Sequence, residues 1–329
     1  MRRLRTISTV LFLASIILFG VYWYREKISK DQTGPVFSVG DDMLTISVRD
    51  GEDALLRGIT ASDAADGDVT DSIIVESISP FTGTGHRIVE YAAFDSDNHV
   101  AHIKRELAYS DYTAPRFALS KPLSFPMNAT NLLEGVRVSD VIDGDITKSL
   151  RMLSEDEIDT AHVGKYPARL KVTNSAGGVS YLPVTIEIFD STSKYKMPQI
   201  KLSDYIVYVE RGNYFDEEDY LQSITISGVE YEPVTENGTY AARWLPADNT
   251  DKTVNYDLIE IESNVDTDVT GCYEVEYSFE DTVNGTGTGE NRMYVVVIDS
   301  NKARAAGSGS SFADAQTHAD GSAAEGGAN

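Results

Sequence analysis

Cysteine is almost absent from this sequence. Among 329 residues there is one, Cys272, and a single thiol cannot form an intramolecular disulfide, which excludes a disulfide framework. Cys272 follows Gly271 at the start of a predicted strand and has no cysteine or histidine motif around it. We therefore interpret it as a small packed side chain rather than as a catalytic nucleophile.

Basic residues are also scarce. The chain has 28 lysines and arginines against 52 aspartates and glutamates, which gives a formal net charge of −24. So acidic a surface repels the phosphate backbone of nucleic acids, and this excludes DNA or RNA as a partner. The charge keeps a protein soluble and also attracts cations, and solubility is the simpler interpretation.

Motifs that carry catalysis are missing as well. The sequence contains no Gly-x-Ser-x-Gly elbow, no Walker loop, no cysteine pair and no Ser-His-Asp order. Its histidines are scattered, and the neighbouring His99 and His102 would face opposite sides of a strand. The sequence therefore predicts neither an enzyme nor a histidine pair that holds a metal.

One long apolar run stands near the N-terminus, at residues 6–24. It is about as long as a membrane-spanning helix needs to be, and Tyr22, Trp23 and Tyr24 close it as an aromatic belt would. More positive charge precedes the run than follows it, so the positive-inside rule places the N-terminus in the cytoplasm. We expect a single-pass protein of the cell membrane whose bulk is extracellular.

A cleaved signal peptide is the alternative interpretation of this run. Cleavage requires small residues after the apolar stretch, whereas this stretch ends on bulky aromatic side chains. The sequence therefore favours a signal-anchor that stays attached to the chain.

Three copies of one unit follow the apolar run. Each copy opens with a proline that is followed two residues later by Phe or Ile, and the openings recur roughly every 80 residues. This spacing is a little under the usual size of an Ig-like domain. The opening prolines are Pro35, Pro115 and Pro198.

Late in each copy, a glycine starts a strand in which apolar and polar residues alternate. These strands are residues 85–95, 164–174 and 271–281, and they are followed by returning strands at 100–109, 179–189 and 293–298. The alternation predicts a β-hairpin with one buried and one solvated face in every copy. The shared register makes Tyr91, Leu170 and Tyr277 equivalent core positions.

The predicted fold class is all-β, with three tandem Ig-like β-sandwich domains preceded by one transmembrane helix. Residues 1–33 form a cytoplasmic stub, the helix and a short linker. Residues 34–113 and 114–193 form the first two domains, and residues 194–300 form a longer, divergent third. Residues 301–329 have almost nothing to bury and predict a disordered tail.

An aspartate-rich loop recurs in the first two copies only. Its residues are Asp63, Asp66 and Asp68 in the first copy, and Asp140, Asp143 and Asp145 in the second. Clustered carboxylates beside a permissive glycine can supply several of the six to eight oxygen ligands that Ca²⁺ takes, although the spacing is not that of an EF-hand. Asp-Gly is equally a standard turn dipeptide. Calcium and a purely structural turn both stay open, and no other cofactor is expected.

These motifs resemble the bacterial Ig-like repeats of surface proteins, especially those of Gram-positive bacteria. The resemblance rests on the opening Pro-x-Phe or Pro-x-Ile, on Asp-x-x-Asp-Gly-Asp-(Val/Ile)-Thr, and on Gly-x-Tyr-x-Val-x-Tyr-x-x-x-Asp, which is fullest at residues 271–281. It covers roughly residues 34–300. It implies an extracellular array, often a spacer or adhesive stalk, and it implies no enzymatic activity.

Two classes of function follow from this organisation. The first is a surface stalk or an adhesion or protein-interaction module, whose partner is another surface protein. The second is a module that binds cell-envelope glycans or another ligand through aromatic side chains of the third domain, such as Trp244, Tyr240 and Tyr231. For Trp244 itself, a core position is the preferred interpretation.

Overall fold

A computed structural model describes residues 2–299 except 30–32, 83–85, 155–156, 237–238, 249–251, 256–258 and 283. At residues 2–6, 26–29, 235–236 and 239–243 only the backbone is described. The expected tail at 301–329 and the glycine that opens the run at 85–95 lie outside the described residues. One long N-terminal helix is followed almost entirely by strands, which confirms the predicted all-β class.

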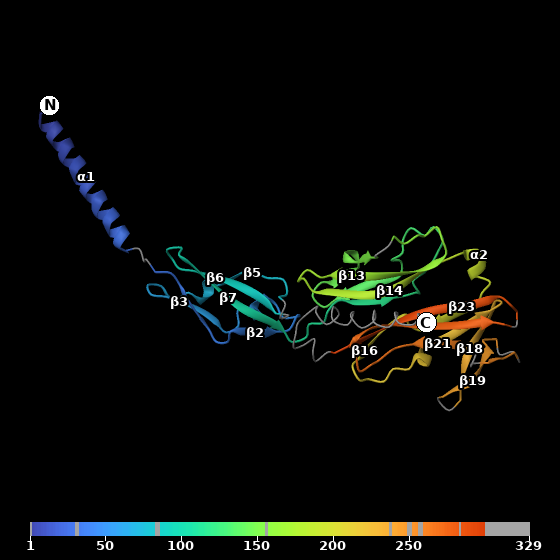
Figure 1. Cartoon of the computed structure of the whole chain (residues 1–329). Helices are drawn as coiled ribbons and strands as arrows, with labels where there is room; N and C mark the ends of the chain where they lie inside the picture. The colour runs from blue at the N-terminus through green and yellow to red at the C-terminus, as the bar shows by residue number, and fades with distance from the viewer. Residues whose placement is uncertain are drawn as a thin grey trace, which may run out of the picture. The chain divides into compact units, whose positions relative to one another are not determined.

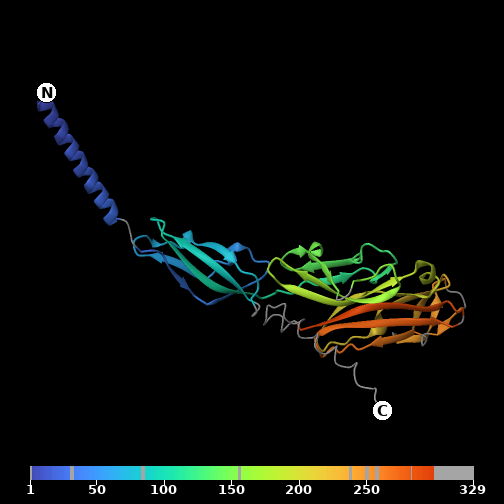
Figure 2. The same ribbon diagram turned by 45° about the horizontal axis from the view of Figure 1, so that its top comes forward.

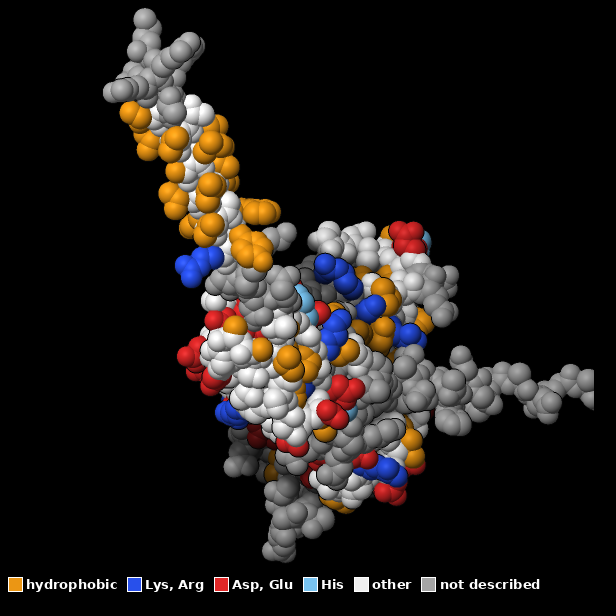
Figure 3. Space-filling model, turned by 90° about the vertical axis from the view of Figure 1, so that its left-hand side faces the viewer, with side chains coloured by type: hydrophobic (Ala, Val, Ile, Leu, Met, Phe, Trp, Pro, Cys, Tyr) orange, Lys and Arg blue, Asp and Glu red, His pale blue; other side chains and the backbone are white. Residues whose placement is uncertain are grey.

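The N-terminal helix α1 (Arg2–Ser29) contains the apolar run. From Ile7 to Arg25 it is long and apolar enough to cross a membrane, and none of this stretch is buried within the protein. Figure 3 shows hydrophobic side chains along the displayed face of the helix. Such a helix leaves a large apolar surface for a bilayer to cover, and a signal sequence satisfies the same criteria of length and composition.

The first sandwich combines a three-stranded sheet, in the order β1-β3-β4, with a four-stranded sheet, in the order β2-β7-β6-β5 (Figure 1). Inward side chains of β6 and β7, among them Val89, Tyr91 and Leu107, are fully buried between the sheets. The elements are β1 (Val36–Val39), β2 (Met43–Ile46), η1 (Glu52–Ala54), β3 (Ile59–Asp63), β4 (Gly67–Asp68), η2 (Thr70–Ser72), β5 (Ile74–Ile78), β6 (Arg87–Phe94) and β7 (Val100–Tyr109).

The second sandwich repeats this plan, with strand orders β11-β10-β8 and β12-β13-β14-β9. Short β9 joins β14 in parallel, and every other pair is antiparallel. The elements are β8 (Arg116–Leu119), β9 (Ser124–Pro126), β10 (Val136–Asp140), β11 (Gly144–Asp145), η3 (Thr147–Ser149), β12 (Arg151–Leu153), β13 (Gly164–Thr173) and β14 (Val179–Phe189), and the short α2 (Ser191–Lys194) follows.

The third sandwich is larger, with strand orders β15-β17-β18-β19-β20 and β16-β23-β22-β21. Its extra strands lie in the first of these sheets, which agrees with its predicted divergence. The elements are β15 (Gln199–Leu202), β16 (Ile206–Glu210), η4 (Glu217–Tyr220), β17 (Leu221–Ile226), β18 (Val229–Glu236), β19 (Thr239–Pro246), β20 (Val254–Asn255), β21 (Ile259–Ser263), β22 (Gly271–Asp281) and β23 (Gly287–Ile298).

The closing hairpins follow the predicted pattern with one difference. Strands β7 and β14 cover the returning strands predicted at 100–109 and 179–189. Strand β23 begins at Gly287 instead of at residue 293, because its ladder with β22 continues as far as the pair Asp281 and Gly287. Glycine and threonine dominate the start of β23, so side-chain alternation could not reveal that part of the strand.

The three predicted core positions are confirmed. Tyr91, Leu170 and Tyr277 each have 0% of their surface exposed. The Tyr91 hydroxyl donates to the Leu55 carbonyl at 2.7 Å, and the Tyr277 hydroxyl donates to the Glu217 carbonyl at 2.8 Å. Both tyrosines thus satisfy their one polar atom at a short 3₁₀ turn, whereas Leu170 has no polar atom to satisfy.

By their internal contacts, the described residues form two compact units. One unit holds the helix and most of the first sandwich, and the other holds the second and third sandwiches. The domain limits at 34–113, 114–193 and 194–300 stay a prediction.

The second and third sandwiches pack directly against each other. Tyr294 and Val296 of β23 belong to the same hydrophobic cluster as Ile186 of β14, and Figures 1 and 2 both show the green strands β13 and β14 alongside the orange-red β23. The Tyr294 hydroxyl accepts from the Thr185 backbone N–H at 2.9 Å, and Thr185 Oγ1 donates to Glu274 at 2.9 Å. Although consecutive in sequence, these two domains therefore form one body.

A charge network lies beside this junction. The Arg292 guanidinium has only 7% of its side chain exposed and reaches Glu274 at 3.2 Å, Glu276 at 2.8 Å and Glu290 at 3.3 Å. Lys165 of the second sandwich joins the network, with its Nζ 2.9 Å from Glu276 and 2.8 Å from Glu290. The third sandwich thus holds a nearly buried cation among three carboxylates, and one cation of the second sandwich shares two of them.

Candidate functional site

The first aspartate-rich loop is held by hydrogen bonds to its own backbone. Asp63 Oδ1 accepts from the N–H groups of Ala65 at 2.8 Å and of Asp66 at 3.1 Å. Asp68 Oδ1 accepts from the Thr70 N–H at 3.0 Å. These are the short-range bonds by which aspartate stabilises turns.

The middle aspartate of each loop reaches across to the turn of the closing hairpin. Asp66 accepts from the backbone N–H of Ser96 at 2.8 Å and from its hydroxyl at 2.9 Å. Asp143 accepts from both groups of Ser175 at 2.6 Å. Each loop is therefore tied to a segment about 30 residues later in the chain, which explains a structural need for aspartate at this position.

The second loop repeats the hydrogen bonds of the first loop that are described above. Asp140 Oδ1 accepts from the N–H groups of Ile142 and Asp143, and Asp145 Oδ1 accepts from the Thr147 N–H at 2.9 Å. Hydrogen bonds from Thr70 and Thr147 lower the pKa of Asp68 and of Asp145 respectively. Both carboxylates thus stay charged at neutral pH.

The two loops differ at one buried atom. Asp140 Oδ2 accepts from the side-chain amide of Asn174 at 3.1 Å. The position of Asn174 is taken by Asp95 in the first sandwich, and there Asp63 Oδ2 is buried with no hydrogen-bond partner among the described residues. Burial raises the pKa of Asp95, but hydrogen bonds from His99 outweigh this effect and hold that pKa below its ordinary value.

The six aspartates use most of their carboxylate oxygens to hold the loops together. In the part of the chain that the structure describes, neither aspartate set gathers three ligand atoms within 4.8 Å of one another. Most of their oxygens already accept from protein donors. The contacts of the loops agree with the turn interpretation, and the unpartnered oxygen of Asp63 distinguishes the first loop from the second.

Two of the three aromatic residues named for glycan binding are not available for it. Trp244 has 0% of its surface exposed and Tyr231 has 8%, and both belong to the core of the third sandwich. The Tyr240 side chain lies outside the described residues. The core interpretation of Trp244 is therefore confirmed. The expectation of an exposed aromatic at Tyr231 was wrong, because this residue also packs into the core of the third sandwich.

Cys272 packs against the cluster that joins the second and third sandwiches. Burial raises the pKa of its thiol to about 12, so the thiol stays protonated at neutral pH and lacks the thiolate that a nucleophile needs. This agrees with its interpretation as a packed side chain.

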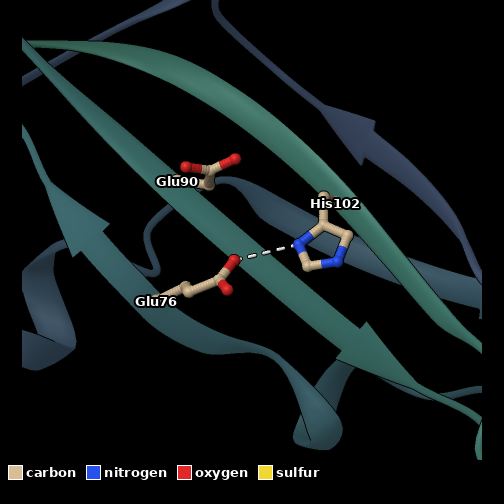
Figure 4. A group of neighbouring side chains, drawn as sticks. All are labelled: Glu76, Glu90 and His102. Atoms are coloured by element: carbon tan, nitrogen blue, oxygen red, sulfur yellow. Dashed lines mark hydrogen bonds and ion pairs between the residues drawn. The ribbon is translucent and has the colours of Figure 1, made fainter.

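A different group of side chains comes together on the first sandwich, and no sequence motif indicated it. Glu76 of β5, Glu90 of β6 and His102 of β7 point to the same place on the outward face of their sheet (Figure 4). One potential ligand atom from each lies within 4.8 Å of the other two. His102 Nδ1 is 2.9 Å from Glu76 Oε2. We call these three residues the outward trio.

Sequence comparison identifies no relative: no protein-family model matches the chain, and no curated protein matches it. Solved structures with partial similarity include the CBM51-2 and INT domains of ZmpB from Clostridium perfringens in complex with GlcNAc. That match has 19% identity and a TM-score of 0.20, and it covers 45% of this chain and 26% of the other.

Two further structures cover more of the chain. The lipoprotein BT2262 from Bacteroides thetaiotaomicron has 12% identity and a TM-score of 0.21, over 55% of this chain and 98% of its own. Protocadherin Gamma B2 extracellular cadherin domains 1–5 have 11% identity and a TM-score of 0.17, and the match covers 81% of this chain and 60% of the protocadherin chain. The chain spans only 26–31% of the first ZmpB structures. Similarity this low assigns neither a family nor a function.

Proposed function

We propose that this chain is a single-pass membrane protein that displays its β-sandwiches outside the cell as a surface stalk or an adhesion or protein-interaction module, without enzymatic activity. The observation that carries the proposal is the uncovered apolar helix. None of the stretch from Ile7 to Arg25 is buried, and Leu18 and Phe19 have 70% and 69% of their surfaces exposed. So much exposed apolar surface requires a bilayer or a partner to cover it.

The joined second and third sandwiches suit the interaction role. Their shared hydrophobic cluster and the Lys165 ion pairs hold the two domains together. A preorganised surface loses less conformational entropy on binding than two freely hinged domains would. We propose that this body contacts the partner, which is another surface protein of the bacterial envelope, as the resemblance to Ig-like repeats implies.

Glycan binding in the third domain is the alternative function. It now lacks support from Trp244 and Tyr231, which are core residues. Tyr195 and Tyr214 are exposed over 74% and 83% of their surfaces, but exposure by itself does not make an aromatic side chain a sugar platform. A glycan array with the full extracellular part would decide between the two functions.

Topology provides the first test of the proposed function. With one epitope tag at each end, protease added to intact cells should remove the C-terminal tag and leave the N-terminal tag in a short membrane-bound fragment. The positive charge before the helix predicts this orientation. Immunoblots of the membrane fraction against each tag make the measurement.

Two results would contradict this prediction. Protection of both tags would place the sandwiches inside the cell, and loss of the N-terminal tag before protease treatment would identify a cleaved signal peptide. As a control, Leu13→Arg together with Ile17→Arg should release the chain from the membrane, since each charge costs about 3 kcal/mol at the centre of a spanning helix.

Calcium binding by the aspartate loops stays a proposal, and the unpartnered oxygen of Asp63 favours the first loop. If the site exists, millimolar Ca²⁺ should raise the melting temperature of the first sandwich by mass action. Asp63→Asn should abolish the shift, and Asp145→Asn in the second loop should retain it. Calorimetry of the full chain in detergent, with and without Ca²⁺, measures the melting temperature of the wild type and of both variants. A melting temperature that Ca²⁺ does not change in the wild type would leave the aspartates as turn formers only.

A further inference from the structure

A β-bulge lies at Glu76 of the outward trio. The register between β5 and β6 shifts between Val75 and Ser77, so Ser77 pairs with Glu90 and Glu76 is the extra residue between the two pairs. Glu76 and Ser77 are both exposed, whereas in a regular strand one of them would point into the core. Bulges commonly re-aim side chains beside functional sites. Ile74 pairs with Ala92 on the outward face, so Glu76, two residues later, lies on that face as well. There it meets Glu90 of β6 and His102 of β7.

A small residue on the central strand allows the outer two members of the trio to meet. Ala92 of β6 lies between Ile74 on β5 and His102 on β7 in the ladder. It is on the same face of β6 as Glu90, yet only 2% of its surface is exposed. A larger side chain here would stand between Glu76 and His102, which instead approach to 2.9 Å.

Comparison with the other histidines separates this group from an ordinary ion pair. His99 Nδ1 lies 2.6 Å from Asp95, and His162 Nδ1 lies 2.5 Å from Asp159. Among the described residues, neither of these pairs belongs to a group of three potential ligand atoms. Among the residues that the structure describes, His102 alone has a second carboxylate close enough for three ligand atoms to share one centre.

We propose that Glu76, Glu90 and His102 form a binding site for a zinc-class divalent transition metal. An imidazole nitrogen with carboxylate oxygens is a ligand set that Zn²⁺ accepts, and three protein ligands leave a fourth tetrahedral position open to water. Ca²⁺ and Mg²⁺ prefer oxygen ligands throughout, so the histidine selects against them. Three neighbouring strands hold the ligands, so little ordering is needed for the ion to bind.

One neighbouring cation competes for the site. Lys104 Nζ lies 3.5 Å from Glu90 Oε1, and the lysine side chain is 65% exposed. An exposed pair of this length contributes little stability, so the lysine can swing into solvent when a divalent ion arrives. The strong negative charge of the chain also raises the local concentration of cations.

Titration of the untagged full-length chain in detergent with ZnCl₂ tests the proposal. Calorimetry should show one Zn²⁺ bound per chain, and His102→Gln and Glu76→Gln should each lower the affinity at least tenfold. His99→Gln and His162→Gln are matched controls, because each removes a histidine paired with one carboxylate, and both should keep the wild-type affinity. Co²⁺ in place of Zn²⁺ should give d–d absorption bands that disappear in His102→Gln.

Lys104→Ala adds a variant that removes no ligand, and it should strengthen binding. Circular dichroism of each variant shows whether the first sandwich still folds, which separates loss of a ligand from loss of structure. Unchanged zinc affinity in His102→Gln, or an equal loss in His99→Gln, would overturn the proposal and leave the trio as a surface ion pair.

Discussion

Leu170→Ala is expected to destabilise the joined second and third sandwiches by about 2–5 kcal/mol. Leu170 has 0% of its surface exposed and lies in the cluster that continues into Val296 of the third sandwich. Removing its branched end forfeits apolar burial and leaves a cavity that close-packed neighbours cannot fill. Urea unfolding of the full chain, followed by circular dichroism, measures the change in the free energy of unfolding.

Leu153→Ala supplies the matched control, since this leucine lies on the neighbouring strand β12 with 45% of its surface exposed. It should change the free energy of unfolding by less than about 0.5 kcal/mol. Equal effects of the two substitutions would contradict the assignment of Leu170 to the core. Because the cluster spans two domains, the Leu170 variant should lower the unfolding midpoint of both together.

Arg292→Ala is expected to cost about 2–4 kcal/mol, because it leaves three neighbouring carboxylates without their principal cation. The arginine side chain is 7% exposed, whereas the side chains of Glu274, Glu276 and Glu290 are 33%, 27% and 29% exposed, so solvent offsets part of the loss. The same urea titration measures the effect. Arg211→Ala, which removes a side chain 57% exposed and 3.8 Å from Asp299, should be nearly neutral.

Acid should weaken the same network. Burial acts to raise the pKa of Glu276, but Lys165 and Arg292 outweigh it and hold that pKa below the ordinary value. A carboxylate whose pKa is lowered on folding contributes stability above its unfolded pKa and loses it as the pH falls through its folded pKa. The free energy of unfolding of the wild-type protein should therefore decrease as the pH falls through the folded-state pKa of Glu276. In Arg292→Ala the free energy of unfolding should depend less steeply on pH. An equally steep dependence in the variant would assign the acid sensitivity to other carboxylates.

The packing of the second and third sandwiches changes what the tandem repeats imply for function. A stalk in which every domain is an independent link bends at each junction, and its reach depends on its linkers. Here the Thr185 backbone N–H donates a hydrogen bond to the Tyr294 hydroxyl across one of the junctions. The chain therefore consists of one two-domain body and, as a separate unit, the first sandwich. The interaction surface of the proposed module should accordingly be sought on both domains of that body.

Features that depend on neighbouring residues could be predicted from the sequence. Alternation with a period of two is a local property of a strand with one buried face, so it located Tyr91, Leu170 and Tyr277 in three cores. An uninterrupted apolar run likewise predicts a helix long enough for a membrane. The turn role of the aspartates follows from bonds to residues two or three positions away, such as those of Asp63 and Asp140.

Features that depend on residues distant in sequence required the tertiary structure. Tyr231 is buried in a cluster with residues distant in sequence, such as Val275 and Met293, and nothing next to it in sequence shows this. The junction of the second and third sandwiches joins residues about 110 positions apart, as Thr185 and Tyr294 are. The outward trio joins residues of three strands, and Glu76 and His102 lie 26 positions apart in sequence. The register of the sheet decides which residues of neighbouring strands face one another, and it leaves no signal in composition or spacing.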